Sequence, residues 1–491
     1  MYLGIDLGTS ELKVVLIDRE QRLIATTRQP LSLQRPQPQW SEQDPAAWWQ
    51  AVEGALADLR RRVPAELAAV VSIGLSGQMH GAVLLDREGR VLRPAILWND
   101  VRSSRECVEL ETRAPDLQRI TGNLAMPGFT APKLLWMARH EPELFRATAK
   151  VLLPKDYLRR QLTGEDVSEM SDASGTLWLD VGRRDWSDTM LEASGLTRSH
   201  MPRLVEGCEP SGILSARLAQ AWGMGEGVIV AGGGGDNAAT AAGIGAVADG
   251  EGFLSLGTSG VLFVATAAFR PNPAEAVHAF CHALPGQWNQ MAVMLSAASC
   301  LRWVTQLAGA ADEAALLAEV ETLSESARQR APLFLPYLSG ERTPHNDANA
   351  KGVWFGLTHD TDRASLGYSV LEGVAFGMAD GYRALQAVGT SLRNMALVGG
   401  GARSRFWAEL LASALNLPLH RHAGGEAGAA LGAARLALLA ADPRAIIADV
   451  CRPPPLLDSI APVAAWSDVL APRFARFRAL YRALRPMFAA G

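Results

Sequence analysis

Short apolar runs that end in small residues recur along the 491-residue chain and predict β-strands followed by turns. The first run, Tyr2 to Leu7, leads into a Gly-Thr-Ser turn and a second apolar run, Leu12 to Asp18. A third strand is predicted near Leu23 to Arg28, and apolar positions at helical spacing predict an amphipathic helix from about Pro45 to Arg61. Another buried strand, Val70 to Leu75, follows. Strands followed by helices in this order indicate an α/β fold.

The opening pattern returns in the second half of the chain. Residues 253–259 repeat the strand and its Gly-Thr-Ser turn, and a second apolar strand, Val261 to Val264, follows. About 250 residues separate the two copies, which predicts two related domains, because solenoid repeats are roughly 20–50 residues long. Residues 249–252, Asp-Gly-Glu-Gly, have the composition of a linker. We therefore expect an N-terminal domain of residues 1–247 and a C-terminal domain of residues 248–491.

Two further strands end in glycine loops. The run from Val228 to Ala231 leads into four glycines and then Asp236-Asn237, with an Ala/Gly-rich helix beyond. The run from Met395 to Val398 leads into three glycines and a helix from about Arg405 to Leu415. The Ala-rich stretch 427–441 carries Arg435 and predicts a buried helix, because a charge in its middle does not suit a membrane span.

Composition and charge exclude several classes of protein. Apolar residues make up 48% of the chain and charged residues 20%, as in ordinary globular enzymes and unlike disordered or collagen-like chains. A net charge of -4 gives no electrostatic reason to expect a nucleic-acid or membrane partner. Five scattered cysteines without a CxxC pair favour free thiols in a reducing compartment, and no signal-peptide pattern opens the chain. We therefore expect a cytoplasmic enzyme that acts on small molecules.

The segment near residues 473–485 is the most basic part of the chain. Phe474, Phe477, Tyr481 and Leu484 recur at helical spacing, and arginines occupy much of the remainder. This pattern predicts a surface helix with a solvated basic face, with a membrane- or RNA-contacting helix as the less favoured alternative.

A Gly-Thr-Ser turn between two strands suits a phosphate. Glycine allows close approach of the backbone to an anion, and successive N–H groups and hydroxyls can donate to its oxygens. One copy alone could be an ordinary hairpin, but two copies, each opening a half of the chain, indicate two loops converging on one polyphosphate in a cleft. The third glycine loop lies between a strand and a helix, and could add backbone donors for a nucleotide. The candidate ATP-binding residues are Gly8, Thr9, Ser10, Gly257, Thr258, Gly400, Gly401 and Ala402.

The two copies differ at a position that bears on catalysis. The first copy carries Asp6 where the second carries Ser255. A carboxylate beside phosphates would repel them unless a cation lies between. Since Mg²⁺ favours one or two carboxylates together with water and phosphate oxygens, we interpret Asp6 as a catalytic residue that contacts Mg²⁺ through coordinated water.

The acceptor side is predicted at two other strand ends. Asp236 follows a strand and begins a helix, a position where a lone Asp can equally be a helix cap. The four preceding glycines favour a functional role: a general base that takes the proton of the acceptor hydroxyl, with Asn237 bonded to a neighbouring hydroxyl. Met79 and His80 end the strand from Val70; His80 could be structural or a donor to sugar oxygens, and Met79 could supply apolar surface.

Together, these segments resemble the FGGY carbohydrate kinase family. GFTAPKLLW at 128–136 resembles the first family signature, and GVWFGL at 352–357, continuing to LEG at 371–373, resembles the second. Within the family, the motifs GQMHGA, LLPKDYL and LSGERTPHN, from residues 77, 152 and 338, are most similar to members that act on D-xylulose. One departure is local: four glycines precede Asp236 where the family pattern leads us to expect three.

The resemblance implies two ribonuclease-H-like (actin-like ATPase) domains around a central cleft, the first binding sugar and the second nucleotide. It implies phosphorylation of D-xylulose with ATP and Mg²⁺, with Asp236 as the general base and Met79 and His80 in contact with the sugar. The C-terminal helix is a candidate to pack back on the first domain, and a homodimer is one expectation for the assembly.

Two alternatives stay open at this point. The chain could phosphorylate another ketose or a polyol, such as ribulose or glycerol, but glycerol kinases carry a charged pair at the positions of Met79 and His80. It could also be an actin- or chaperone-like ATPase that phosphorylates nothing. Asp236 beside Asn237 argues against the second alternative, because attack by water needs no sugar-binding neighbours.

Overall fold

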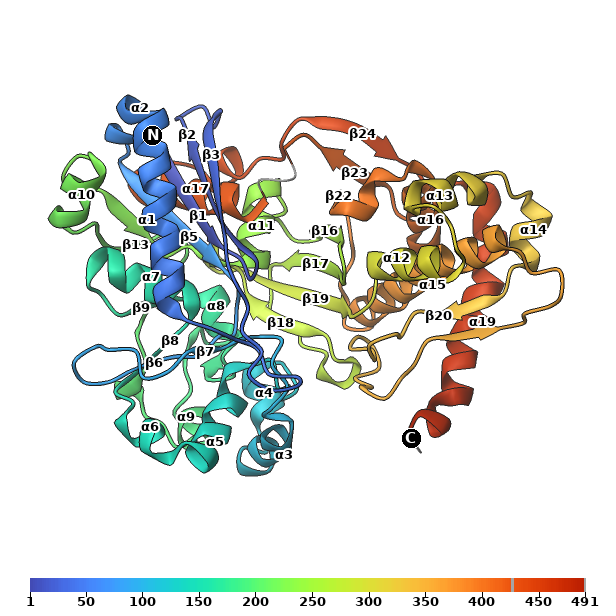
Figure 1. The fold of residues 1–491 in the computed structure, drawn as a ribbon, viewed down its shortest axis with the longest axis horizontal. Coiled ribbons are helices and arrows are strands. Elements are labelled where there is room, and N and C mark those ends of the chain that lie inside the picture. Colours follow the sequence, from blue (N-terminus) through green and yellow to red (C-terminus); the bar gives the residue numbers. More distant parts are fainter. Residues whose placement is uncertain (425–427, 490–491) are drawn as a thin grey trace.

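The computed structural model describes residues 1–424 and 428–489, and its two lobes are each built on a mixed sheet (Figure 1). The strand order of the first sheet is β13-β14-β5-β1-β2-β3, with β15 beside β5. The strand order of the second sheet is β18-β19-β17-β16-β22-β23-β24. The bounds in the first sheet are β1 (Tyr2–Leu7), β2 (Glu11–Ile17), β3 (Leu23–Pro30), β5 (Ser72–Gly77), β13 (Pro210–Ile213), β14 (Ile229–Ala231) and β15 (Gly234–Gly235). Those in the second are β16 (Glu251–Leu256), β17 (Gly260–Thr266), β18 (His278–Cys281), β19 (Trp288–Met294), β22 (Asn394–Val398), β23 (Leu419–His422) and β24 (Leu456–Ile460).

The internal repeat predicted from the sequence is present in the topology. In the first sheet, β1 pairs antiparallel with β2 and parallel with β5. In the second, β16 pairs antiparallel with β17 and parallel with β22. Each Gly-Thr-Ser turn therefore follows a central strand of its sheet, and that strand has one antiparallel and one parallel partner in both sheets. The α/β fold of two related halves is confirmed, while the domain boundary near residues 247–252 stays a prediction.

Helix α1 (Pro45–Arg62) shows how local signals set an element. Asp44 caps its N-terminus by accepting a hydrogen bond from Ala46 N at 2.9 Å, and Pro45 occupies the first turn, where its missing N–H costs nothing. The apolar stripe that begins at Trp48 and ends at Leu59 is fully buried against the first sheet. The predicted helix from Pro45 to Arg61 is thus confirmed to within one residue.

Helix α17 (Gly428–Ala441) ties the two halves of the chain together. It comes from the second half of the sequence, yet it packs against β1, β5 and α11 (Asp236–Ile244). A Cβ at Gly4 would lie 2.0 Å from a backbone oxygen of α17, and a Cβ at Gly74 would lie 1.8 Å from another. Arg435, buried inside this contact, donates hydrogen bonds to Ala242 O and Gly243 O at 2.8 and 2.9 Å. The predicted buried helix is confirmed over its described residues, and Ala427 lies outside them.

The C-terminal helix, α19 (Ala464–Ala489), packs on the second half of the chain. Its neighbours are α15 (Arg363–Gln386), α16 (Arg405–Leu415) and β20 (Leu333–Leu335). Arg473 reaches from α19 to the buried Glu372, with contacts of 2.6 and 2.7 Å. The suggestion that this helix packs back on the first domain is therefore wrong, because its ion pair and its aromatic stripe lie against the second core. Among the described residues, no helix combines the length and apolarity needed to cross a bilayer.

A buried ionic network lies behind the loop that precedes Asp236. The Lys155 ammonium, on α7 (Pro154–Thr163), is 2.6 Å from Asp156 Oδ1, 3.1 Å from Asp172 Oδ2 and 3.4 Å from Glu169 Oε1. All four side chains are shut off from solvent. Such charges are tolerable in an interior only when they are paired, so the network behaves as one unit.

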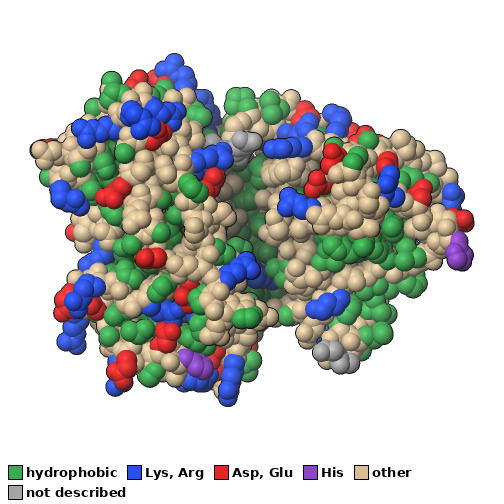
Figure 2. Space-filling model, viewed as in Figure 1, with side chains coloured by type: hydrophobic (Ala, Val, Ile, Leu, Met, Phe, Trp, Pro, Cys, Tyr) green, Lys and Arg blue, Asp and Glu red, His purple; other side chains and the backbone are tan. Residues whose placement is uncertain are grey.

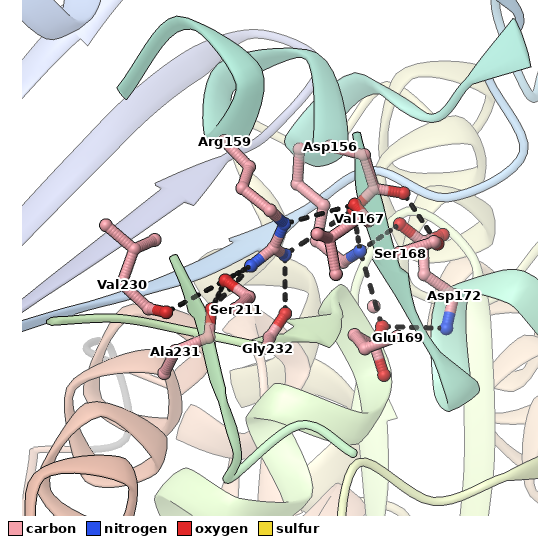
Figure 3. Close-up of polar contacts among 12 residues, drawn as sticks. Asp156, Arg159, Val167, Ser168, Glu169, Asp172, Ser211, Val230, Ala231 and Gly232 are labelled. Atoms are coloured by element: carbon pink, nitrogen blue, oxygen red, sulfur yellow. Dashed lines mark hydrogen bonds and ion pairs between the residues drawn. The ribbon is translucent and has the colours of Figure 1, made fainter. Parts of the chain in front are cut away.

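Arg159 extends this network to the glycine loop (Figure 3). Its guanidinium donates hydrogen bonds to Ala231 O at 2.5 Å and to Gly232 O at 2.6 Å. On the other side of the loop, Gly235 N donates to Ser171 Oγ at 3.0 Å. Ser171 in turn donates to Glu169. Carbonyl and N–H groups of the loop are thus both held from α7 and its neighbours.

Two of the four glycines of this loop are required by space, and the other two are closely packed. A Cβ would come within 2.1 Å of a backbone oxygen at both Gly232 and Gly233, and Gly233 also has a positive φ of 77°. A Cβ at Gly234 would press on neighbouring atoms from 3.1 Å, and one at Gly235 would lie 2.8 Å from Met79 Sδ. Gly232 and Gly233 are therefore the two positions of the loop where a side chain would require the backbone to move.

Gly74→Ala tests the close approach of α17. The added methyl group meets a backbone oxygen at 1.8 Å, so the helix must move away from the first sheet. We expect a loss of about 1–3 kcal/mol, the usual cost of overpacking, seen as a lower unfolding midpoint in scanning calorimetry. Gly225→Ala is the matched control, because nothing lies within 4 Å of its Cβ position. Equal melting of the two variants would contradict this packing.

Arg159→Met tests the clamp on the glycine loop. The change leaves Gly232 O without its guanidinium donor and removes one donor each from Ala231 O and Asp156, and losing one partner of a buried ionic group costs about 3–5 kcal/mol. Arg160→Met, at the next position of α7, removes only a partly exposed pair with Asp166 and should cost about 0–1 kcal/mol. Thermal unfolding of both variants gives the comparison, and similar midpoints would show that the clamp adds little.

Candidate functional site

A groove separates the two lobes in the space-filling view (Figure 2). One cavity of this groove, of about 850 Å³, is bordered by both halves of the chain. From the first half come strand residues that include Lys13, Thr26 and Arg28, and from the second half come the glycine loop at Gly399 and Gly400. A ligand here would contact both halves at once.

A second cavity, of about 540 Å³, gathers four of the predicted ATP-binding residues. Gly257 and Thr258 border it from one side, and Gly400 and Gly401 border it from the other. Helices α12 (Ala298–Leu307) and α13 (Glu313–Glu321) and the start of α16 complete the wall. The sequence placed these residues in two loops about 140 positions apart, and the structure brings the loops to one cavity that suits a nucleotide.

Glycine makes this cavity possible where the loop after β22 meets β16. Gly399 has a φ of 94°, and a Cβ there would lie 2.7 Å from Leu256 O. The following turn, Gly400–Arg403, contains Ala402. No atom lies within 4 Å of a Cβ position at Gly400, so its backbone faces open space. These features leave backbone groups exposed for a phosphate or a base.

The first Gly-Thr-Ser turn lies at the end of β1, away from the lining of that cavity. Gly8 N donates to Glu11 O at 3.0 Å and closes the turn. The Thr9 hydroxyl donates to Gln78 Oε1 at 3.0 Å and accepts a hydrogen bond from Trp98 Nε1 at 3.0 Å. The proton of the Thr9 hydroxyl is therefore already committed, and the Ser10 hydroxyl and the backbone N–H groups of Thr9 and Ser10 remain as donors of this turn. Neither Gln78 nor Trp98 was assigned a role from the sequence, although Gln78 lies in the GQMHGA motif that resembles the family.

Asp6 and Asp236 come together through strand register. Asp6 in β1 is level with Ser76 in β5, and Ser76 is level with Gly234, two residues before Asp236. Burial and the nearby charge of Asp6 raise the pKa of Asp236 to about 6. Burial likewise raises the pKa of Asp6. Two carboxyl groups that disfavour each other's charge mark a place where a cation stabilises both.

The residues around Asp6 fit a magnesium ion bound together with phosphates. Asp6 Oδ1 is buried and has no hydrogen-bond partner in the described chain. Among the described residues, no group of three His, Cys, Asp or Glu side chains could hold a metal by itself. Mg²⁺ usually relies on one or two carboxylates, with water and substrate phosphates as its other ligands. Asp6 therefore fits the predicted contact through coordinated water.

The carboxylate of Asp236 is oriented by Asn237. The backbone N and the Nδ2 of Asn237 donate to the same oxygen, Asp236 Oδ1, at 2.7 and 2.9 Å. Asp236 is the first residue of α11, and its carboxylate makes no bond to the later N–H groups that a helix cap would satisfy. The second carboxylate oxygen is left available to a ligand. This geometry favours the general-base interpretation over simple capping.

His80 is held as a neutral ring of one tautomer. Its Nδ1 lies 2.8 Å from Gly175 O, and because a carbonyl oxygen can only accept, Nδ1 carries the proton. Burial, with a smaller effect of the Lys133 charge, lowers the pKa of His80 to about 3. Its Nε2 is therefore an acceptor, which corrects the prediction that His80 donates to sugar oxygens. The ring packs edge-on against Phe129, with centroids 4.9 Å apart.

The backbone at His80 is fixed by a residue that the sequence did not single out. His80 has a positive φ of 69°, unusual for a side chain of this size. Lys133 Nζ donates to His80 O at 2.8 Å and to Gly128 O at 2.7 Å, and Thr130 donates to His80 O at 3.2 Å. Lys133 lies in the segment that resembles the first family signature. The sequence therefore identified the motif, but it did not show that Lys133 binds the carbonyl of His80. Met79, one residue before His80, packs against Gly235.

Comparison with known proteins gives relatives along the whole chain. The chain is 52% identical to the xylulose kinase of Escherichia coli K12 over 490 residues, which covers 100% of both proteins. It is 50% identical to the xylulose kinase of Klebsiella pneumoniae, over 99% of this chain and 100% of the relative. A crystal structure titled xyloylose kinase, from Brucella ovis, matches with a TM-score of 0.96 and 52% identity, covering 99% of each chain.

Sequence models of one family match both lobes. The N-terminal domain model of the FGGY family of carbohydrate kinases matches residues 1–243, and the C-terminal domain model of the same family matches residues 252–441. The first match contains Asp6, His80 and Asp236, and the second contains the glycine loops of the nucleotide cavity. The chain belongs to the FGGY family of carbohydrate kinases.

Proposed function

We propose that this carbohydrate kinase phosphorylates D-xylulose with ATP and forms D-xylulose 5-phosphate. The observation that carries the proposal is Asp236, whose carboxylate is oriented by Asn237 and lies close enough to Asp6 to feel its charge. Identity of 52% over full length to a xylulose kinase supports the choice of sugar.

The sugar would lie between Asp236 and the cavity beside His80. Met79 gives the apolar surface that a carbon chain needs, and its contact with Gly235 places it next to the base. His80 Nε2 would accept a hydrogen bond from a sugar hydroxyl, since its Nδ1 is engaged with Gly175. Neither Met79 nor the neutral His80 carries a charge, which suits a neutral sugar.

The chemical step needs one proton acceptor. As the C5 oxygen bonds to the γ-phosphorus and the bond to the β–γ bridging oxygen breaks, the hydroxyl proton passes to the free oxygen of Asp236. The hydrogen bonds from Asn237 hold the carboxylate in place during this transfer. The hydrogen bonds from Arg159 to the preceding loop limit the displacement of the proposed base, Asp236.

The phosphate side would be shared between Asp6 and the glycine loops. When bound, Mg²⁺ neutralises charge on the phosphate oxygens. Asp6 would hold its coordinated water, and the loops at Gly257 and Gly400 would donate backbone hydrogen bonds. The expected homodimer and the cytoplasmic location stay predictions.

A coupled assay of ADP release tests the function directly. The purified chain is incubated with ATP and Mg²⁺ and with D-xylulose, D-ribulose, glycerol or no sugar. We expect release that depends on D-xylulose and is weak with the other acceptors. Release that is independent of sugar would favour an ATPase, and a preference for another acceptor would replace the proposed substrate.

Asp236→Asn should reduce turnover by about 10²–10⁴-fold, the usual contribution of a general base. The amide keeps the shape of the side chain but cannot take the proton. Binding of a non-hydrolysable ATP analogue should not change. Glu226→Gln, at an exposed position of the same half, is the matched control. Wild-type turnover in Asp236→Asn would remove this residue from the mechanism.

Asp6→Asn should raise the Mg²⁺ concentration needed for half-maximal rate by roughly 10–100-fold, the typical effect of losing an outer-sphere partner of a metal. Sugar binding, measured by calorimetry without nucleotide, should stay as in the wild type. The opposite pattern, an unchanged Mg²⁺ requirement with lost sugar binding, would place Asp6 on the sugar side.

A further inference from the structure

A guanidinium in the cavity beside His80 has no partner. The cavity is bordered by His80, Trp98 and Phe129 from the first half of the chain, and by His278 and Arg342 from the second half. Within the described residues, no hydrogen bond or ion pair joins the Arg342 side chain to another group, and only its backbone N is engaged. Burial lowers the pKa of this guanidinium, and the nearby charge of Glu341 acts against that shift.

The backbone on either side of Arg342 is firmly placed. Arg342 N and Leu295 N both donate to Glu341 Oε1, at 2.7 and 3.0 Å. Thr343 N donates to Val293 O at 3.1 Å, and the Thr343 hydroxyl accepts a hydrogen bond from Val293 N at 3.0 Å. This segment is thus fastened to β19 and its end, and Arg342 is directed into the cavity by a fixed backbone.

The ring N–H groups of Trp98, His80 and His278, which also border the cavity, already donate hydrogen bonds within the protein. Trp98 Nε1 donates to Thr9, and His80 Nδ1 donates to Gly175. His278 Nδ1 lies 3.3 Å from Asn123 Oδ1, which can only accept. Burial, assisted by the charge of Arg342, lowers the pKa of both histidines, so each offers an acceptor at Nε2. Arg342 is the group that supplies donors to a ligand there.

We propose that Arg342 binds the hydroxyketone end of the sugar, donating hydrogen bonds to the C1 and C2 oxygens. The inference rests on the proposed function, which puts the C5 hydroxyl at Asp236. Met79 packs against Gly235, the residue before Asp236, and the neighbouring His80 borders the cavity that also contains Arg342. A five-carbon ketose anchored at C5 therefore presents its C1 hydroxyl and C2 carbonyl to this cavity. Two adjacent oxygens match the fork of a guanidinium.

The unpaired state of Arg342 separates this role from a structural one. A structural arginine lowers stability when it is removed, because it leaves its partners without a donor. Arg342 has no such partners among the described residues, so its loss should leave the unfolding midpoint unchanged or raise it. Its loss should weaken sugar binding alone.

Calorimetric titration of D-xylulose into Arg342→Met and Arg342→Lys, without nucleotide, tests the proposal. We expect about 10–100-fold weaker binding for the Met variant, the range for losing hydrogen bonds from a charged donor, and an intermediate loss for Lys. Affinity for the ATP analogue should not change. For the matching pentitol, which has a hydroxyl in place of the carbonyl, the Met change should have a smaller effect. Arg330→Met, at an exposed position, is the control.

The outcomes separate the two proposals. If the wild type binds and phosphorylates D-xylulose and Arg342→Met binds it equally well, the role of Arg342 is overturned while the function stands. If the wild type neither binds nor phosphorylates D-xylulose, both fall. Tighter binding of a five-carbon aldonate than of D-xylulose would assign the guanidinium to a carboxylate instead. Should the Met variant fail to fold, Arg342 is structural, unless the Lys variant melts normally with weakened sugar affinity.

Discussion

The hydrogen bonds from Arg159 to the carbonyls of Ala231 and Gly232 fix the loop on which the proposed active site depends. A loop of four glycines has little conformational preference of its own, so its path must be set from outside. Arg159 holds the start of the loop and Ser171 holds its end at Gly235. Asp236, the proposed base, follows at the next position, and its place relative to Asp6 is then set by the register of β5. Charges buried in the network are therefore used to place a functional loop rather than to add net stability.

Close backbone approach is the second constraint, and it joins the two halves of the chain. Helix α17 follows the nucleotide cavity in sequence but lies on the sheet that ends in Asp6. Glycine at positions 4 and 74 lets the helix backbone reach the strands, and a single methyl group would separate them. The same helix contacts α11, which begins at Asp236. A shift of α17 would therefore displace α11 and, with it, Asp236.

Much of the site could be predicted because its signals are local. Strand ends, glycine loops and the Asp at position 236 are each visible in a few consecutive residues, and the repeat of the Gly-Thr-Ser turn predicted two halves. The tautomer of His80 could not be predicted, since it depends on Gly175, 95 residues away in the sequence. The commitment of the Thr9 hydroxyl to Gln78 depends likewise on a distant pairing. The packing partners of α17 and α19 could not be predicted for the same reason. An apolar pattern shows that a helix is buried but does not show which part of the fold it packs against.

The sugar cavity has a physical property that neither half of the chain has alone. Most of its apolar ring faces come from the first half and each half supplies one acceptor nitrogen, whereas its uncommitted side-chain donors belong to Arg342 of the second half. Arg342 is held by β19, which shares a sheet with β16 and β17, the strands that carry the Gly-Thr-Ser turn at the nucleotide cavity. A sugar that binds Arg342 would therefore contact the same sheet whose Gly-Thr-Ser turn borders the proposed nucleotide cavity. Water can satisfy the same guanidinium but cannot span the distance to Asp236, so a bound sugar links groups that water leaves independent. That difference gives a physical reason for transfer to the sugar to be favoured over hydrolysis.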